Sequence, residues 1–231
     1  MTAGTRMRCL VIFDFDGTLA DTWRDIATAL NRTLQEAGLP AASAADVQSW
    51  IGDGITRLLE RAVPEEARRA HPIPDVVARF VAHYDRCLLD ATVLYPGISD
   101  CLAQLAGHPL AILSNKSTRY LDRLVVGLGL AGRFVAVVGG DAVPAKKPDA
   151  AVVRYVMAQV GFEPDELWMI GDSALDIATG NAAGARTIGC AWGLRGRNEL
   201  QRAGAEFIVD DAREIAPLIC SPRRRGDAEE S

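Results

Sequence analysis

The sequence contains no apolar stretch that approaches the roughly 20 residues of a membrane-spanning helix. Residues 1–8 include no apolar segment of the kind found in signal peptides, and the apolar run that follows is only five residues long before Asp14. We therefore expect a cytoplasmic protein with no membrane partner.

Cysteine and histidine are scarce, and neither shows a metal-binding spacing. The five cysteines are scattered without a CxxC pair, and the three histidines form neither an HxxxH nor an HExxH pattern. An odd number of scattered cysteines is typical of small buried side chains in a reducing compartment. We interpret the histidines as surface or helix-end residues rather than as ligands.

Positive charge is not in excess either. The 25 Lys and Arg residues against 30 Asp and Glu residues give a net charge of −5, whereas a nucleic-acid partner needs a basic face. With 49% hydrophobic and 24% charged residues in a chain of 231, the composition is that of a soluble globular protein. No internal repeat is present, and we expect the polar residues 222–231 to form a disordered tail.

The most informative stretch is Asp14-Phe15-Asp16-Gly17-Thr18, which directly follows the apolar residues 9–13. Such a run predicts a buried parallel strand, and open α/β sheets bind their ligands at the carboxyl ends of strands. Two close carboxylates repel each other unless a cation joins them, and an oxygen site suits Mg²⁺. Because Asp and Gly also favour ordinary turns, the rest of the sequence must decide.

Two types of organisation follow along the chain. Residues 21–93 show helical spacing and no convincing strand, with helices predicted over 22–37, 43–51, 55–63 and 74–90. From residue 94 onward strands and helices alternate, with strands predicted over 110–113, 134–138, 167–170, 187–191 and 207–209. The sequence therefore predicts an α/β fold: a Rossmann-like, doubly wound parallel sheet (residues 1–20 and 94–221) with an inserted helical cap domain (residues 21–93).

Polar residues of distinct types follow four of the predicted strands. They are Asp14 and Asp16 after the first strand, Ser114-Asn115-Lys116 after the second, Lys146-Lys147-Pro148 after the third, and Gly171-Asp172-Ser173 with Asp176 after the fourth. Each could be a helix cap or a solvated side chain. Because the carboxyl ends of parallel strands share one edge, the four together predict a single catalytic site.

These segments resemble the motifs of the haloacid-dehalogenase-like (HAD) superfamily of phosphatases. Its first motif, Asp-x-Asp-Gly-Thr after a strand, is matched by residues 14–18, and its second, Ser or Thr at a strand end, by Ser114. Its third, a Lys often followed by Pro, is matched best by Lys147, and its fourth, Gly-Asp-x-x-x-Asp, by residues 171–176. The resemblance covers nearly the whole chain, and the set of motifs is highly specific.

The resemblance implies a phosphomonoester hydrolase that uses Mg²⁺ and forms an aspartyl-phosphate. Asp14 is the expected nucleophile and a metal ligand, together with the main-chain carbonyl of Asp16 and the carboxylate of Asp172, while Asp176 orders metal-bound water. Asp16 is also the expected general acid, which protonates the leaving oxygen and then activates water.

Further residues are expected to hold the phosphoryl group. Ser114 and main-chain N–H groups of the first motif and near Asn115 would bind phosphate oxygens, and Lys147 would neutralise charge on the transferring group. Gly17 allows the chain to turn closely past the phosphate, and Thr18 would fix that turn.

Within the superfamily, the closest likeness is to the bacterial phosphoglycolate phosphatases, which implies hydrolysis of 2-phosphoglycolate to glycolate and phosphate. The similar segments are residues 14–22, 50–54, 60–62, 95–97, 114–116 and 191–193. Asp149-Ala150 replaces the Asp-Pro of many relatives, and Ala174-Leu175 is a plainer pair than usual; neither departure touches a catalytic role.

Gly52-Asp53-Gly54 interrupts the helices of residues 21–93 and has two open interpretations. As part of a cap, this loop would close over the sheet edge and contact the substrate. Equally, it could be a plain helix–helix turn.

Three alternatives for the function stay open. The chain could be a phosphatase of another small metabolite, or a phosphosugar mutase, because mutases of the superfamily keep the same core motifs. A receiver-like, phosphorylation-dependent binding module is disfavoured by the acid/base residue Asp16 and by the long helical insertion. The expected partner is a small-molecule phosphomonoester, and the sequence does not distinguish a monomer from a homodimer.

Overall fold

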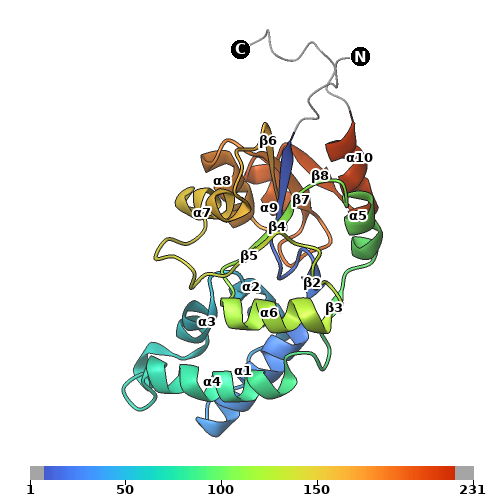
Figure 1. Ribbon diagram of the computed structural model, residues 1–231. Helices are drawn as coiled ribbons and strands as arrows, with labels where there is room; N and C mark the ends of the chain where they lie inside the picture. Colours follow the sequence, from blue (N-terminus) through green and yellow to red (C-terminus); the bar gives the residue numbers. More distant parts are fainter. Residues whose placement is uncertain (1–7, 222–231) are drawn as a thin grey trace, which may run out of the picture.

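The structure is a computed structural model and describes residues 8–221 (Figure 1). The predicted disordered tail, residues 222–231, lies outside the described residues. Within the described range, no helix is both long enough and apolar enough to cross a membrane.

A six-stranded sheet in the order β5-β4-β1-β6-β7-β8 forms the centre of the fold, and every strand pair in it is parallel. The strands are β1 (Cys9–Phe13), β4 (Leu110–Leu113), β5 (Ala136–Val138), β6 (Glu166–Gly171), β7 (Arg186–Cys190) and β8 (Phe207–Val209). The predicted α/β fold is thus confirmed. The strand order reverses at β1, and this is the point where open α/β sheets form their ligand crevice.

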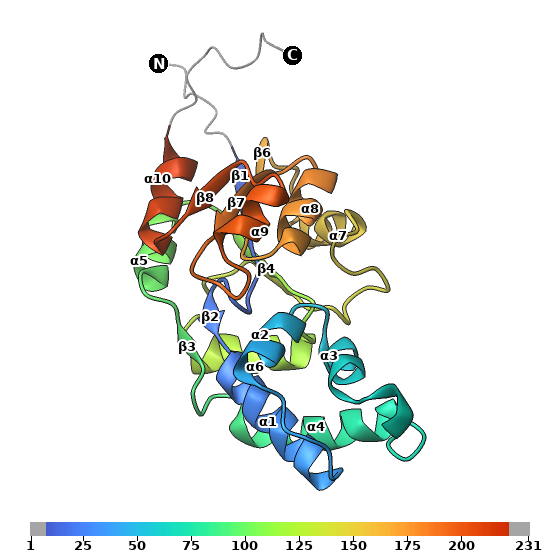
Figure 2. The ribbon, with the colours of Figure 1, turned by 180° about the vertical axis from the view of Figure 1, so that it is seen from behind.

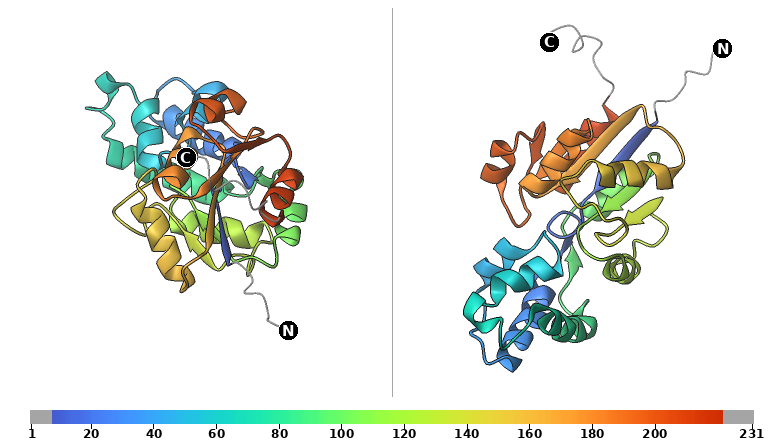
Figure 3. Two further views of the ribbon diagram at one scale, coloured as in Figure 1. Left: turned by 90° about the horizontal axis from the view of Figure 1, so that it is seen from above. Right: turned by 90° about the vertical axis from the view of Figure 1, so that its left-hand side faces the viewer.

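Helices cover both faces of the sheet, as Figure 2 and Figure 3 show from further sides. They are α5 (Ile98–Gln104), α6 (Thr118–Gly127), α7 (Ala151–Val160), α8 (Ala174–Ala182), α9 (Arg197–Arg202) and α10 (Ile215–Cys220), with a short 3₁₀ turn at Ala212–Glu214. Alternate residues of β1 belong to two different apolar clusters, with Val11 and Phe13 in one and Leu10 and Ile12 in the other. A strand that is buried on both faces explains the continuous apolar run in the sequence.

A helical insert occupies most of the chain between β1 and β4. It contains α1 (Trp23–Glu36), α2 (Ala44–Trp50), α3 (Ile55–Ala62), a 3₁₀ turn (Glu65–Ala67) and α4 (Ile73–Cys87). In Figure 1 and in the right-hand view of Figure 3, these helices lie beyond the carboxyl ends of the strands. The division into a core and a cap with the predicted boundaries stays a prediction.

The expectation that residues 21–93 contain no strand is wrong at both ends of the insert. Strand β2 (Ala20–Asp21) pairs antiparallel with β3 (Val93–Leu94), so that the two connections of the insert run side by side. Two-residue strands are too short to show a period-2 pattern, and their pairing joins distant segments, so the sequence alone did not reveal them.

Candidate active site

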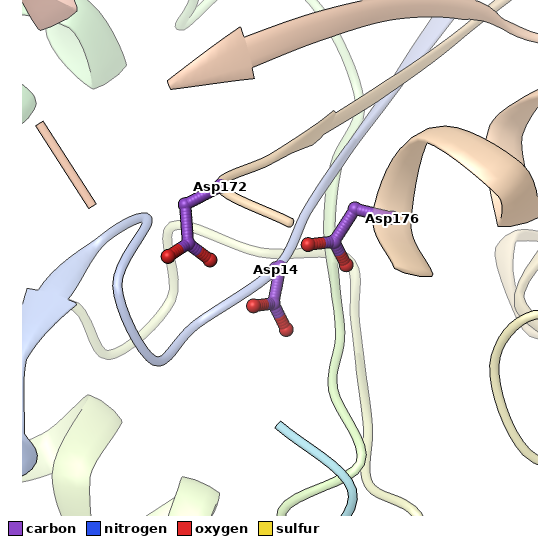
Figure 4. Close-up of side chains that lie close together, drawn as sticks. All are labelled: Asp14, Asp172 and Asp176. Atoms are coloured by element: carbon purple, nitrogen blue, oxygen red, sulfur yellow. The ribbon is translucent and has the colours of Figure 1, made fainter. Parts of the chain in front are cut away.

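Three carboxylates gather where β1 and β6 end. Asp14 follows β1 and Asp172 follows β6, and the main-chain N–H of Asp14 donates to the carbonyl of Ile170 over 2.8 Å. Asp176 approaches from the first turn of α8 (Figure 4). Asp14, Asp172 and Asp176 are buried, and each offers one oxygen such that these oxygens lie within 4.8 Å of one another. The predicted meeting of the first and fourth motifs therefore takes place.

Lys147 joins this cluster from the loop between β5 and α7. Its Nζ lies 2.7 Å from Asp14 Oδ1 and 2.6 Å from Asp176 Oδ1, and the side chain is buried. Burial alone would lower the pKa of this ammonium group, but the charges of Asp14 and Asp176 raise it above its usual value. Lys147 therefore stays protonated between the two carboxylates.

The cluster contains three carboxyl groups but only one ammonium group. Burial raises the pKa of Asp14 to about 7, an effect that Lys147 opposes and Asp176 reinforces. Burial and the charges of Asp176 and Asp14 likewise raise the pKa of Asp172 well above its usual value. These shifts mark a site that a divalent cation would stabilise, and its oxygen-only donors fit Mg²⁺.

Asp14 and Asp172, the two candidate metal ligands, differ from Asp176 in their hydrogen bonding. Asp176 Oδ1 accepts from Lys147, and its Oδ2 accepts from the main-chain N–H and the hydroxyl of Ser173 at 3.1 and 2.6 Å. Asp172 Oδ2 accepts from the main-chain N–H of Leu194 over 2.6 Å, and Asp14 Oδ1 accepts from Lys147. Because both oxygens of Asp176 are engaged, the geometry favours an indirect role for Asp176 at a metal.

Asp16 belongs to a second hydrogen-bonded group beside the first. Its Oδ1 accepts from the Thr22 hydroxyl over 2.6 Å, and its Oδ2 lies 3.2 Å from Lys116 Nζ. Lys116 Nζ also donates to the Tyr84 hydroxyl of α4 over 3.0 Å. Burial alone would lower the pKa of the Lys116 ammonium, but Asp16 and Tyr84 raise it above its usual value. A residue of the helical insert therefore reaches the group that contains Asp16.

Gly17 and Thr18, two further predicted site residues, lie in the turn after β1. Gly17 has φ of +85°, and a Cβ there would collide with the carboxylate of Asp172, so glycine is required for this close approach. Thr18 is buried, but it does not line the cavity, and its hydroxyl finds no partner within the described residues. Gly17 therefore permits the turn, and neither residue lines the cavity.

The segment after β4 connects the site to the insert. Ser114 lines the cavity, while Asn115 donates from Nδ2 to the carbonyl of Gly52 over 3.0 Å and accepts from the main-chain N–H of Lys147 over 3.3 Å. Arg195, in the loop after β7, donates to main-chain carbonyls at the end of α2. These hydrogen bonds hold the loop between α2 and α3 against the sheet edge.

A small cavity of about 50 Å³ lies between the sheet edge and the insert. Its core side includes Asp14, Asp16 and Ser114, and its other side includes Gly52 and Gly54 of the loop. The Asp53 side chain does not line this cavity. It pairs instead with Arg61, and both side chains are partly exposed. The main chain of this loop, rather than its carboxylate, therefore faces the site.

Sequence reasoning missed three residues of the site. Lys116 was part of a recognised motif, but a strand-end Lys is indistinguishable from a solvated one in the sequence. Tyr84 lies within the predicted helix 74–90, where no motif marks it, and Arg195 belongs to a loop without a motif. Their roles depend on contacts between the core and the insert, which no local pattern encodes.

Residues 11–190 match the family model of haloacid dehalogenase-like hydrolases. The phosphoglycolate phosphatase of Chromobacterium violaceum is 38% identical over 214 residues, which cover 90% of this chain and 95% of that protein. The phosphoglycolate phosphatase of Pectobacterium atrosepticum is 34% identical over 215 residues, with 90% of each chain covered. The crystal structure of a predicted phosphoglycolate phosphatase from Haemophilus somnus has a TM-score of 0.85 at 28% identity, and the match covers 94% of this chain and 100% of that one.

The family match and the curated relatives together identify a hydrolase. The chain belongs to the haloacid dehalogenase-like hydrolase family, and it is an enzyme of the phosphatase class, as its curated relatives are. The resemblance inferred from the motifs is thus confirmed.

Proposed function

We propose that this enzyme is a Mg²⁺-dependent phosphomonoesterase that acts through an aspartyl-phosphate on a small phosphorylated metabolite, with 2-phosphoglycolate as the best-supported substrate. The observation that carries the proposal is the contact of Lys147 with both Asp14 and Asp176 beside the buried Asp172. This set contains a nucleophile, a fixed cation and oxygen ligands for a metal, which are the parts that phosphoryl transfer needs.

In the first step, Asp14 attacks phosphorus while the bond from phosphorus to the leaving oxygen breaks. Lys147 contacts Oδ1 of Asp14, which leaves Oδ2 to form the new bond. Asp16 donates a proton to the leaving oxygen, so that the product departs as an alcohol. Asp14, Asp172 and the main-chain carbonyl of Asp16 would hold Mg²⁺, which when bound supplies charge neutralisation for attack on a phosphate dianion.

In the second step, water attacks the phosphorus of the aspartyl-phosphate. Asp16, now deprotonated, takes a proton from this water, and the bond between phosphorus and Asp14 breaks to release phosphate. Thr22 and Lys116 hold the two oxygens of Asp16, which supports its position beside the reacting group. Ser114 and the main-chain N–H groups nearby would bind phosphate oxygens, and Lys147 would stabilise their charge.

The helical insert, residues 21–93, is proposed to act as a cap over the core formed by residues 1–20 and 94–221. Asn115 and Arg195 of the core hydrogen-bond to main-chain groups of the insert, which supports closure over the site. Such closure excludes water and selects the leaving group.

The similarity to two curated relatives supports 2-phosphoglycolate as the substrate. Both relatives are named phosphoglycolate phosphatases, and each match covers 90% of this chain. Their naming as phosphatases also disfavours the phosphosugar-mutase alternative. Membership of a hydrolase family argues against a receiver-like module.

The proposal is tested by release of inorganic phosphate from a panel of phosphorylated metabolites and from p-nitrophenyl phosphate, with Mg²⁺ present. We expect steady turnover and the highest kcat/KM for 2-phosphoglycolate. A higher kcat/KM for a phosphosugar would overturn the substrate assignment, and the absence of turnover on every ester would overturn the phosphatase itself.

A further inference from the structure

Three cationic side chains line the active-site cavity: Lys147, Arg195 and Lys116. Lys147 lies between Asp14 and Asp176, at 2.7 and 2.6 Å. Arg195 donates to two main-chain carbonyl groups at the end of α2. Lys116, the third, contacts Tyr84 of the insert and Asp16.

Lys116 and Tyr84 together retain unused hydrogen-bond donors. Lys116 Nζ contacts Asp16 Oδ2 at 3.2 Å and the Tyr84 hydroxyl at 3.0 Å, which uses two of the three N–H donors of an ammonium group. The Tyr84 oxygen accepts from Lys116, so its own O–H remains able to donate. Burial raises the pKa of Tyr84 to about 12, and the hydroxyl therefore keeps its proton at neutral pH.

The part of the cavity lining that comes from the helices of the insert is otherwise apolar. It includes Ile26, Ile55, Leu58 and Phe80, and the Phe80 ring packs against Tyr84 at 5.4 Å between centroids. These side chains cannot hydrogen-bond to a polar leaving group. A charged group in this part of the cavity would therefore be stabilised by Lys116 and Tyr84, since an unpaired buried charge is strongly unfavourable.

We propose that Lys116 and Tyr84 form a carboxylate-binding pair, which selects phosphate esters of short 2-hydroxy acids. The inference rests on the proposed phosphatase function and assigns its substrate specificity to two named residues. Asp16, the proposed proton donor to the leaving oxygen, contacts the same Lys116 ammonium. In a bound substrate, only a short carbon chain can therefore connect the carboxylate at Lys116 to the leaving oxygen of the phosphate ester.

The positive charge of Lys116 next to Asp16 supports its assignment as a carboxylate-binding residue. A substrate carboxylate in this position comes close to Asp16, and the two negative charges would repel each other. The positive charge of Lys116, 3.2 Å from Asp16 Oδ2, offsets this repulsion. The third N–H of the ammonium group remains available to donate to the substrate carboxylate. Without Lys116, the cavity would favour leaving groups that carry no charge.

The test compares two substrates of nearly equal size that differ only in charge at this end: 2-phosphoglycolate and its neutral analogue 2-phosphoglycolamide. The full-length enzyme with Mg²⁺ is assayed for kcat/KM on both esters as wild type, Lys116→Met and Tyr84→Phe. Lys146→Met is the matched control, because Lys146 is exposed and precedes Lys147 in the same loop. Circular dichroism and the melting temperature verify that each variant is folded.

We expect the wild type to prefer the acid over the amide by roughly 10- to 100-fold, the range for hydrogen bonds to a charged group. Lys116→Met removes most of this preference, with the larger loss on the acid. Tyr84→Phe keeps the lysine and lowers the preference by a smaller factor, which also tests the inference if Lys116→Met does not fold. Lys146→Met leaves the ratio unchanged.

Three results would overturn the inference. These are a wild type without preference for the acid, a Lys116→Met variant that loses equal factors on both esters, and a Lys146→Met variant that loses the preference as well. Equal losses would mean that Lys116 only positions Asp16. Each of these outcomes leaves the phosphatase function intact, whereas a wild type that hydrolyses neither ester nor p-nitrophenyl phosphate refutes the proposed function itself.

Discussion

Asn115 Nδ2 donates to the main-chain carbonyl of Gly52 over 3.0 Å. A residue at the end of a core strand thereby holds the loop between α2 and α3 over the active site. The same Asn115 accepts from the main-chain N–H of Lys147, so one side chain links the loop to the lysine of the buried carboxylate cluster. The contact uses the main chain of the loop, and Asp53 takes no part in it.

We predict that Asp53→Ala changes kcat/KM by less than about fivefold on both 2-phosphoglycolate and p-nitrophenyl phosphate. Asp53 forms a partly exposed pair with Arg61, and such pairs contribute only about 0–1 kcal/mol. Steady-state kinetics on the two esters provide the measurement. A loss confined to 2-phosphoglycolate would show that the Asp53 carboxylate does reach the substrate.

Lys147→Met should lower turnover of both esters together, by on the order of 10²–10³-fold, because the ammonium acts on the phosphoryl group that they share. The Lys147 Nζ contacts with Asp14 and Asp176 are lost in the same change. The exposed neighbour Lys146 provides the control, and Lys146→Met should retain nearly full activity. Similar losses in the two variants would contradict the role assigned to Lys147.

Asp172→Asn should raise the Mg²⁺ concentration that is needed for half-maximal activity and weaken Mg²⁺ binding, because a neutral amide is a poorer ligand than a carboxylate. Titration calorimetry with Mg²⁺ measures the binding directly, independently of turnover. Ca²⁺ should inhibit the wild type, since it prefers more ligands at longer distances. Full activity of the dialysed wild type in excess EDTA would refute the metal requirement.

Much of the core could be predicted from the sequence because its signals are local. Strand β4 (Leu110–Leu113) coincides with the predicted range, since an apolar run there is bounded by Pro109 and Ser114. The four motif segments meet as expected, because parallel strands place their carboxyl ends at one edge.

The features that the sequence did not reveal depend on packing between distant segments. The contact of Lys116 with Tyr84 joins a strand end of the sheet to a helix of the insert. The helix α9 was also not predicted from the sequence.

The central claim is that Asp14 carries the phosphoryl group, and Asp16→Asn offers the most direct test. This variant lacks the base for the second step, so a phosphoenzyme should accumulate. The reaction with p-nitrophenyl phosphate, whose leaving group needs little protonation, is quenched in acid, and peptides are then analysed by mass spectrometry. We predict one phosphoryl group on Asp14, and none when Asp14→Asn is added to the variant. A phosphoryl group on any other residue, or turnover by Asp14→Asn near that of the wild type, would contradict the account.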